Sequence, residues 1–340
     1  MAAARSIFFA AAACAALAAA GAESAAAPPP AASAAARGDE LRELMDHEDY
    51  ARAEPIIRDA LASLHGAQGL IFYKTDRLAE AVAEWETSLK LDSGNAEVKK
   101  LLDVARKELA AEKGRRREVC EHFIIQYEAG ARADQIANLR AALAVVRRDA
   151  CQRFLAWPAE KFTVILYSSD QYQYDLKRPS WSAADYDGKI RLRGSKILDS
   201  REELAALLTH EYAHALIFRT FGSRIPVWLN EGLAQNARPD AAPEPDALKQ
   251  WNATDKKTLP APWTLGRGFE ATATGNQARA AYLESKFFVR WLLERYDIMV
   301  ITRWGRELAA GKTIDQATAT VFAMSADQLF SAWKESMETK

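Results

Sequence analysis

Cysteine and histidine are scarce in this sequence, with three and five residues among 340. Cys14 lies in an apolar N-terminal run, which leaves Cys120 and Cys151 for the rest of the chain. No CxxC pair occurs, so the chain lacks the usual pattern of a thiolate zinc site. Cys120 and Cys151 could form a disulfide in an oxidising compartment, and two buried free thiols are an equal alternative.

An excess of charge of either sign is also absent, because 45 basic and 46 acidic residues give a net charge of −1 and a pI of about 6.6. The basic run at residues 113–117 belongs to no basic face with interleaved aromatic side chains. We therefore expect a solvated linker there and no nucleic acid as a partner. The composition, 49% hydrophobic and 27% charged, is that of an ordinary globular protein long enough for two domains.

Apolar runs that could span a membrane are lacking, and the one extended apolar stretch is N-terminal. Met1–Arg5 is positive, Ile7–Ala20 is apolar and shorter than a span, and Ala20–Ala22 matches a small-residue cleavage site. We expect residues 1–22 to be a signal peptide and the mature protein to be periplasmic or secreted. Acylation of Cys14, as in a lipoprotein, is a weaker alternative because the residues before it lack the usual leucine.

Two segments precede the C-terminal half. Residues 23–38 consist mostly of Ala, Pro and Ser, which predicts a tether. Residues 39–112 have a helical pattern with two internally similar units. In the second unit, Gly69, Phe72, Ala81 and Trp85 follow one another in an order that resembles a tetratricopeptide repeat. We expect an all-α region that serves as a brace for the next domain or as a docking surface for a protein partner.

The sequence HEYAH begins at His210 and ends at His214. Residues four apart share one face of a helix, so both imidazoles can reach a single ion while Glu211 lies beside it. Ser200 and Glu203 form a capping box that opens this helix. The motif is therefore expected inside a long helix, where the alternative is two ordinary surface histidines.

A third ligand is available 17 residues further on, where Glu231 lies within the apolar helical segment Pro226–Gln235. A carboxylate facing the first helix would complete a His₂Glu site with an open position, the pattern of a catalytic Zn²⁺ site. Gln235 follows Glu231 by one helical turn and could hydrogen-bond a ligating histidine. We expect one Zn²⁺ per chain, held by His210, His214 and Glu231.

HExxH followed by a W-L-x-E-G-x-A helix resembles the gluzincin clan of zinc peptidases, in particular the bacterial peptidase MA-like domains. The resemblance runs from about Val119 to the C-terminus. It implies a zincin-like fold and a peptide or protein substrate. Thermolysin-like enzymes have an aspartate four residues after the third ligand, where this chain has Gln235, so the surroundings of the metal differ.

The predicted chemistry is hydrolysis of a peptide bond. Zn²⁺ would lower the pKa of a bound water, and Glu211 would be the general base that activates it. The oxyanion needs a second electrophile. The resemblance to the peptidase MA-like domains makes Tyr282 the candidate, from its place in the family-like helix after the zinc helices. The stronger alternative for Tyr282 is a core aromatic, because Phe287, Phe288 and Trp291 lie on the same helix.

Residues 113–340 are predicted to form an α+β catalytic domain with a small mixed sheet. Strands are expected at residues 122–128, 161–167 and 189–192, with a helix at 134–154 between the first two. Helices are expected after the zinc helices at 280–296, 298–310, 314–322 and 326–337. Residues 236–262 contain five prolines and are expected to form an irregular loop near the cleft.

The last predicted strand, with Lys189, Ile190, Arg191 and Leu192, alternates charged and apolar residues. This pattern is typical of a sheet edge, to which an extended substrate could add by backbone hydrogen bonds. The alternative is an interior strand, whose backbone groups are already used.

Three functions fit these patterns. The leading one is a zinc-dependent peptidase of the bacterial envelope. The second is a tetratricopeptide-type adaptor whose zincin domain is inactive or structural. The third is hydrolysis of a non-protein amide such as a cell-wall peptide. The three expected metal ligands and the general base Glu211 are all present, which favours an enzyme. No sequence pattern identifies the substrate.

Overall fold

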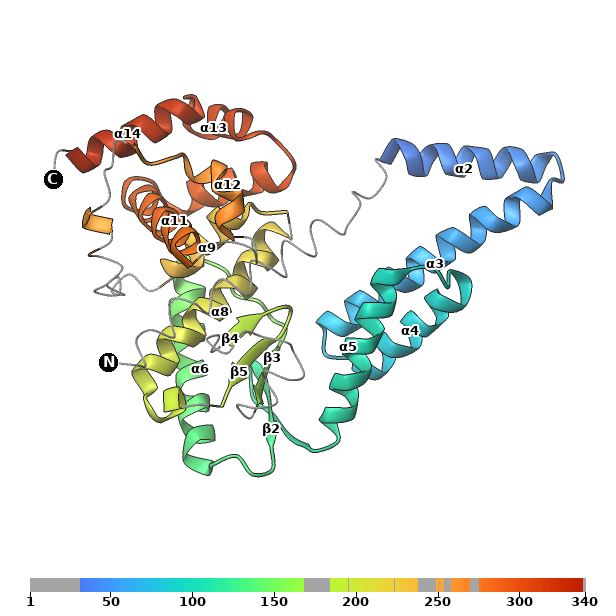
Figure 1. Ribbon diagram of the computed structural model, residues 1–340, viewed down its shortest axis with the longest axis horizontal. Coiled ribbons are helices and arrows are strands. Elements are labelled where there is room, and N and C mark those ends of the chain that lie inside the picture. Colours follow the sequence, from blue (N-terminus) through green and yellow to red (C-terminus); the bar gives the residue numbers. More distant parts are fainter. Residues whose placement is uncertain are drawn as a thin grey trace. The chain divides into compact units, whose positions relative to one another are not determined.

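The structure, a computed structural model, describes residues 31–167, 184–194, 196–222, 224–237, 249, 251–253, 258–269 and 275–338 (Figure 1). The predicted signal peptide, with Cys14, lies outside the described residues. The chain divides into two compact units that join between Arg117 and Glu118, here called the N-terminal unit and the C-terminal unit. Among the described residues, no helix has both the length and the apolar character needed to cross a membrane.

The N-terminal unit is built from helices. They are α2 (Ala31–Asp46), α3 (Tyr50–Lys74), α4 (Leu78–Leu91) and α5 (Ala96–Glu112). The predicted tether at residues 23–38 is wrong in its second part, because α2 begins at Ala31. The physical reason is its run of alanines, the residue with the highest helix propensity.

Trp85 fixes the packing of α3 against α4. A Cβ at position 69 would lie 2.5 Å from the indole ring, so only Gly69 lets the two helices come this close. The indole nitrogen donates a hydrogen bond to the carbonyl of Gly66 at 3.0 Å. Tyr73 packs on the same ring, and its hydroxyl donates to Glu108 of α5 at 2.6 Å. The core of this unit is therefore centred on Trp85.

The C-terminal unit is α+β, with a small mixed sheet and mostly helical structure around it. Its strands are β1 (Arg115–Val119, which spans the join), β2 (Phe123–Glu128), β3 (Phe162–Tyr167), β4 (Ala184–Tyr186) and β5 (Ile190–Arg193). Its α-helices are α6 (Ala133–Phe154), α8 (Arg201–Phe221), α9 (Val227–Gln235), α11 (Gly275–Arg295), α12 (Ile298–Ala309), α13 (Ile314–Phe322) and α14 (Ala326–Glu338). Short 3₁₀ helices are η1 (Lys196–Asp199), η3 (Pro262–Thr264) and η4 (Gly266–Phe269).

Most predicted elements lie within a few residues of these bounds, and two strands were missed. The basic run at residues 113–117 was predicted to be a linker, and its last three residues form part of β1. β1 is the edge strand of the sheet, where basic side chains can stay solvated. β4 has only three residues, too few for a period-two pattern to be seen. Most of the predicted irregular loop at residues 236–262 lies outside the described residues.

The sheet has the strand order β1-β2-β3-β5-β4, with β2, β3 and β5 parallel and β4 antiparallel to β5. One face is apolar, and its side chains form a common core with α6 and α8. The other face is mixed, because polar side chains lie in register with apolar ones. A row across four strands joins Gln126, Ile165, Arg191 and Asp185.

The predicted edge position of Lys189, Ile190, Arg191 and Leu192 is wrong. β5 pairs with β3 on one side and with β4 on the other, so its backbone cannot receive a substrate strand. Lys189 and Arg191 are buried, although their alternation with apolar residues suggested solvent-facing side chains. Arg191 instead donates to Asp187 at 3.0 Å and to the hydroxyl of Tyr167. Acidic and hydroxyl partners on neighbouring segments thus make burial of this charge possible.

Helix α8 carries the HEYAH motif and has the predicted ends. The Ser200 hydroxyl accepts a hydrogen bond from the backbone N–H of Glu203 at 3.3 Å, and Gly222, with φ of 77°, ends the helix. The apolar side of α8 is buried against α6 and the sheet.

Helix α9 is fixed by close contact with α11. A Cβ at position 232 would lie 2.4 Å from a methyl carbon of Val289 and 2.7 Å from the carbonyl oxygen of Ser285, so Gly232 is required. Trp228, one turn before Gly232 on α9, packs among aromatic rings, and its ring centroid lies 5.9 Å from that of Phe288 on α11. These contacts determine where the carboxylate of Glu231 lies.

Candidate metal centre

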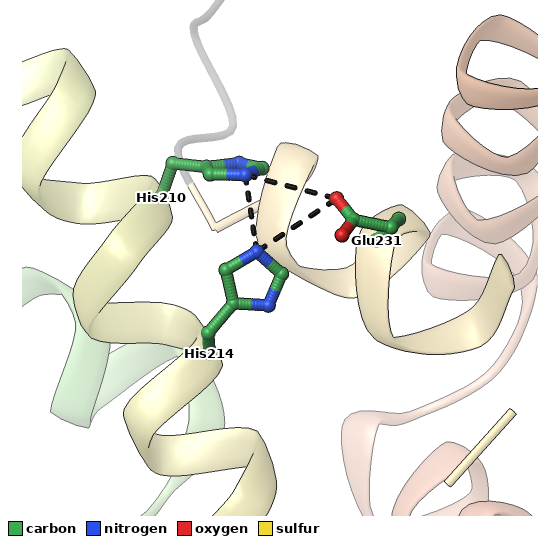
Figure 2. A group of neighbouring side chains, drawn as sticks. All are labelled: His210, His214 and Glu231. Atoms are coloured by element: carbon green, nitrogen blue, oxygen red, sulfur yellow. Dashed lines mark hydrogen bonds and ion pairs between the residues drawn. The ribbon is translucent and has the colours of Figure 1, made fainter. Parts of the chain in front are cut away.

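Three side chains from two helices converge on one point. His210 and His214 project from successive turns of α8 toward Glu231 on α9 (Figure 2). The two Nε2 atoms lie 3.1 Å apart, and each lies 3.7 Å from the same carboxylate oxygen of Glu231. Among the described residues, this is the one group of His, Cys, Asp and Glu side chains that could hold a metal ion.

The spacing of these donor atoms fits a metal ion. Tetrahedral coordination with bonds of about 2.0–2.1 Å separates neighbouring ligand atoms by about 3.4 Å. The observed 3.1, 3.7 and 3.7 Å lie on either side of that value. Both carboxylate oxygens of Glu231 are buried and have no hydrogen-bond partner among the described residues. A buried carboxylate without a hydrogen bond is costly, and a cation at this point would remove that cost.

Burial also sets the protonation of the three groups. Desolvation lowers the pKa of His214 to about 4, against a smaller opposing effect of its hydrogen bond with Asn230. The pKa of His210 is lowered well below its usual range, mainly by desolvation. Desolvation and then the charge of Glu211 raise the pKa of Glu231 well above its usual range. At neutral pH both imidazoles are therefore neutral and offer lone pairs, the form that binds metal.

The histidines are oriented by groups other than the predicted one. Nδ1 of His214 lies 2.9 Å from Oδ1 of Asn230, so Nδ1 carries the proton and Nε2 faces the site. The His210 ring hydrogen-bonds the backbone of Ala234. Gln235, predicted to contact a ligating histidine, donates instead to the carbonyl of Tyr282 at 3.2 Å. The sequence did contain a signal, because Asn230 directly precedes the ligand in the W-L-N-E run.

Replacing Asn230 with alanine is expected to weaken zinc binding by about 10- to 100-fold, because His214 loses the acceptor that fixes its ring and tautomer. The matched control is Gln235→Ala, which removes an amide from the same helix without touching either histidine. Competition with a zinc-binding dye measures both affinities. Equal weakening in the two variants would contradict a specific role for Asn230.

The general-base candidate and the electrophile candidate are both buried. Glu211 lies on α8 next to His210 and is close enough to Glu231 to influence the pKa of that carboxyl. Tyr282 lies on α11, and its ring packs edge-on against Phe269 with the centroids 5.1 Å apart. Tyr282 is thus packed in the hydrophobic core, and Phe269, its partner in this contact, lies on η4 rather than on the same helix.

Two further charged residues on α11 were missed in the sequence. Lys286 is nearly buried, and its charge contributes to the lowered pKa of His210. Glu284 is buried too, and desolvation raises the pKa of its carboxyl to about 8. Neither residue belongs to a recognisable motif, so only the packing of α11 reveals their environment.

The two remaining cysteines are not joined. Cys120 is partly exposed, whereas Cys151 is buried with its sulfur 3.7 Å from the hydroxyl of Tyr212. Of the two equal alternatives, the structure thus favours two free thiols, although only Cys151 is buried. Burial raises the pKa of the Cys151 thiol, so this residue is a poor nucleophile.

Comparison with known proteins covers the segment that contains the metal-ligand group. No curated protein matches this chain. Residues 200–339 match the family model of the Peptidase MA superfamily. The matched segment begins at the cap of α8 and includes His210, Glu211, His214 and Glu231. The match supports a zincin-like, metallopeptidase-type domain over residues 200–339, a type of domain that is typically metal-dependent and acts on peptides or proteins.

Proposed function

We propose that this protein is a zinc-dependent peptidase of the bacterial envelope. The observation that carries the proposal is the convergence of His210, His214 and Glu231 within a segment matched by the Peptidase MA superfamily. Two imidazoles and one carboxylate with an open position are the donor set of catalytic Zn²⁺ sites. Softer metals prefer sulfur ligands, and harder metals prefer oxygen ligands alone. The N-terminal sequence, with its apolar run and cleavage site, supports export.

The metal ligands, Glu211 and Tyr282 have different roles in the proposed hydrolysis. Zn²⁺ held by the three ligands would polarise the scissile carbonyl and lower the pKa of the attacking water. Glu211 accepts the proton of that water and returns it to the leaving amine. For the electrophile that stabilises the oxyanion we propose Tyr282. Its helix packs directly on α9 through the bond from Gln235, which lies one turn from Glu231.

The N-terminal unit supports a second, independent proposal. Gly69, Ala81 and Trp85 are buried together, as a tetratricopeptide-like helix pair requires. We infer that α3 and α4 form such a pair. An adaptor whose zincin domain is inactive remains the alternative function, and it predicts metal binding without turnover.

One experiment separates these functions. The purified protein is incubated with a diverse peptide library that includes cell-wall peptides, alone, with a chelator, and with the chelator followed by zinc. The expected result is cleavage that falls at least about 100-fold with the chelator and returns with zinc. Cleavage that resists the chelator would contradict the zinc mechanism. Stoichiometric zinc without any cleavage would support the adaptor.

A further inference from the structure

Helix α3 carries an exposed apolar stripe that its own unit does not bury. Tyr50, Ile57, Leu64 and Ile71 recur at intervals of seven residues and are 57, 39, 66 and 61% exposed. Seven residues are close to two helical turns, so the four side chains lie on one face. We call these four residues the α3 stripe. Its length of 22 positions exceeds what scattered surface hydrophobics produce.

The stripe lies opposite the face that α3 uses inside the N-terminal unit. Towards α4, α3 presents Gly69 under the Trp85 ring, and the carbonyl of Ala62, which accepts a hydrogen bond from Ser88 at 2.8 Å. With 100° per residue, Ala62 and Gly69 lie about 100–180° from the four stripe residues, and about 140–180° from Leu64 and Ile71. Figure 1 shows α4 alongside α3, in agreement with their many contacts. The stripe is therefore not part of the core centred on Trp85.

Small residues accompany the stripe in the same seven-residue register. Ala60 and Ala67 each follow a stripe residue by three positions and are exposed, whereas Ala53, at the same spacing after Tyr50, is buried. Apolar residues at spacings of three and four form the seam of paired helices. A large side chain at one seam position and alanine at the next lets a second helix come close. The face thus has the pattern of a helix that packs against another helix.

We propose that the α3 stripe binds the α3 stripe of a second copy of this chain, with the two helices antiparallel. A twofold axis between Ala60 and Leu61 places Tyr50 opposite Ile71 of the partner and Ile57 opposite Leu64 of the partner. Each of these contacts then occurs twice, because residue i contacts residue j and residue j contacts residue i in a twofold interface. Leu61 is also exposed and lies at the axis.

Charge decides the direction of the pairing. The end of α2 and the turn before α3, here called the acidic turn, carry the exposed Asp46 and Glu48, and α3 ends at the exposed Lys74. The antiparallel register brings Lys74 of each copy to the acidic turn of the other. A parallel pair would instead bring acidic turn to acidic turn and lysine to lysine. Complementary charge at both ends therefore favours the antiparallel dimer over the parallel one.

Sedimentation velocity on the full chain tests the dimer. The wild type is expected to be dimeric at micromolar concentration. Leu64→Glu should raise the dissociation constant at least about 100-fold, because a carboxylate at the seam must be desolvated. Val104→Glu is the control, since Val104 is 40% exposed on α5, outside the stripe. A wild type that stays monomeric at about 100 μM, or a dimer unaffected by Leu64→Glu, would overturn the proposal.

Disulfide trapping tests the register of the two α3 helices, with substitutions that introduce no charge. Ile57→Cys and Leu64→Cys are made separately in a background in which Cys14 and Cys120 are replaced by serine. Under mild oxidation, only the mixture of the two variants should give a covalent dimer, because residue 57 faces residue 64 of the partner. Covalent dimers within either variant alone would show a parallel pair and contradict the antiparallel arrangement. No covalent dimer in any sample would contradict the interface itself.

Discussion

Replacing Glu211 with glutamine is expected to lower kcat for peptide hydrolysis by about 100- to 10,000-fold, the range that a general base contributes. The amide has the shape of the carboxylate but cannot accept the proton of the attacking water. Glu211 is fully buried on α8, so an isosteric change disturbs the packing least. Steady-state kinetics on the best peptide substrate measures the loss, and KM should change little because Glu211 binds neither the metal nor the bulk of the substrate.

The control for this variant is Glu202→Gln, which changes an exposed carboxylate in the first turn of the same helix. Zinc content and the circular dichroism spectrum are recorded for both variants, so that a loss of metal or of fold is not mistaken for a loss of the base. Should Glu211→Gln hydrolyse peptides at the wild-type rate with its zinc in place, the proposed mechanism is wrong.

Replacing His214 with alanine is expected to abolish stoichiometric zinc binding. The substitution removes one of three protein ligands, and even a group that only orients a ligand is worth 10- to 100-fold in affinity. We therefore expect the affinity for zinc to fall by well above about 100-fold. After dialysis, the variant should retain less than about one tenth of a zinc ion per chain. Zinc is measured by atomic emission on wild type and variant prepared side by side.

Thermal unfolding gives a second readout of the same prediction. Zinc that binds only the folded protein raises the Tm of the wild type, and the increase grows with the zinc concentration. His214→Ala should show no such increase. The control His122→Ala should behave as wild type, because His122 is paired with Glu121 at 3.4 Å and belongs to no metal-ligand group among the residues that the structure describes. Equal, near-stoichiometric zinc in wild type and His214→Ala would contradict the ligand assignment.

Local features of the sequence predicted much of the fold. Helix ends depend on residues within one turn, so Ser200 and Gly222 fixed the bounds of α8. The same holds for the last three helices, whose predicted and observed bounds differ by at most one residue, whereas α11 begins five residues before its predicted start. The pairing of His210 with His214 is equally local, because helical periodicity alone places both rings on one face.

The residues that surround the three candidate metal ligands were harder to predict from the sequence. Gln235 and Asn230 are both amides on α9, and either side of that helix could have faced His214. The crossing of α9 over α8, fixed by the contact of Gly232 with α11, selects Asn230. Lys286 and Glu284 lie more than 50 residues beyond Glu231, and only packing of α11 reveals their surroundings.

The sequence by itself determined the chemical groups of the candidate metal centre and the helices that carry them, because both depend on spacing along a few turns. Tertiary structure alone decided the order of strands, which depends on partners distant in the chain. Lys189–Leu192 has the alternation of an edge strand, yet the three-residue β4 pairs along its outer side and makes it interior. Arg191 can be buried there because Asp187 and Tyr167 bind its guanidinium, a compensation that no local pattern reveals.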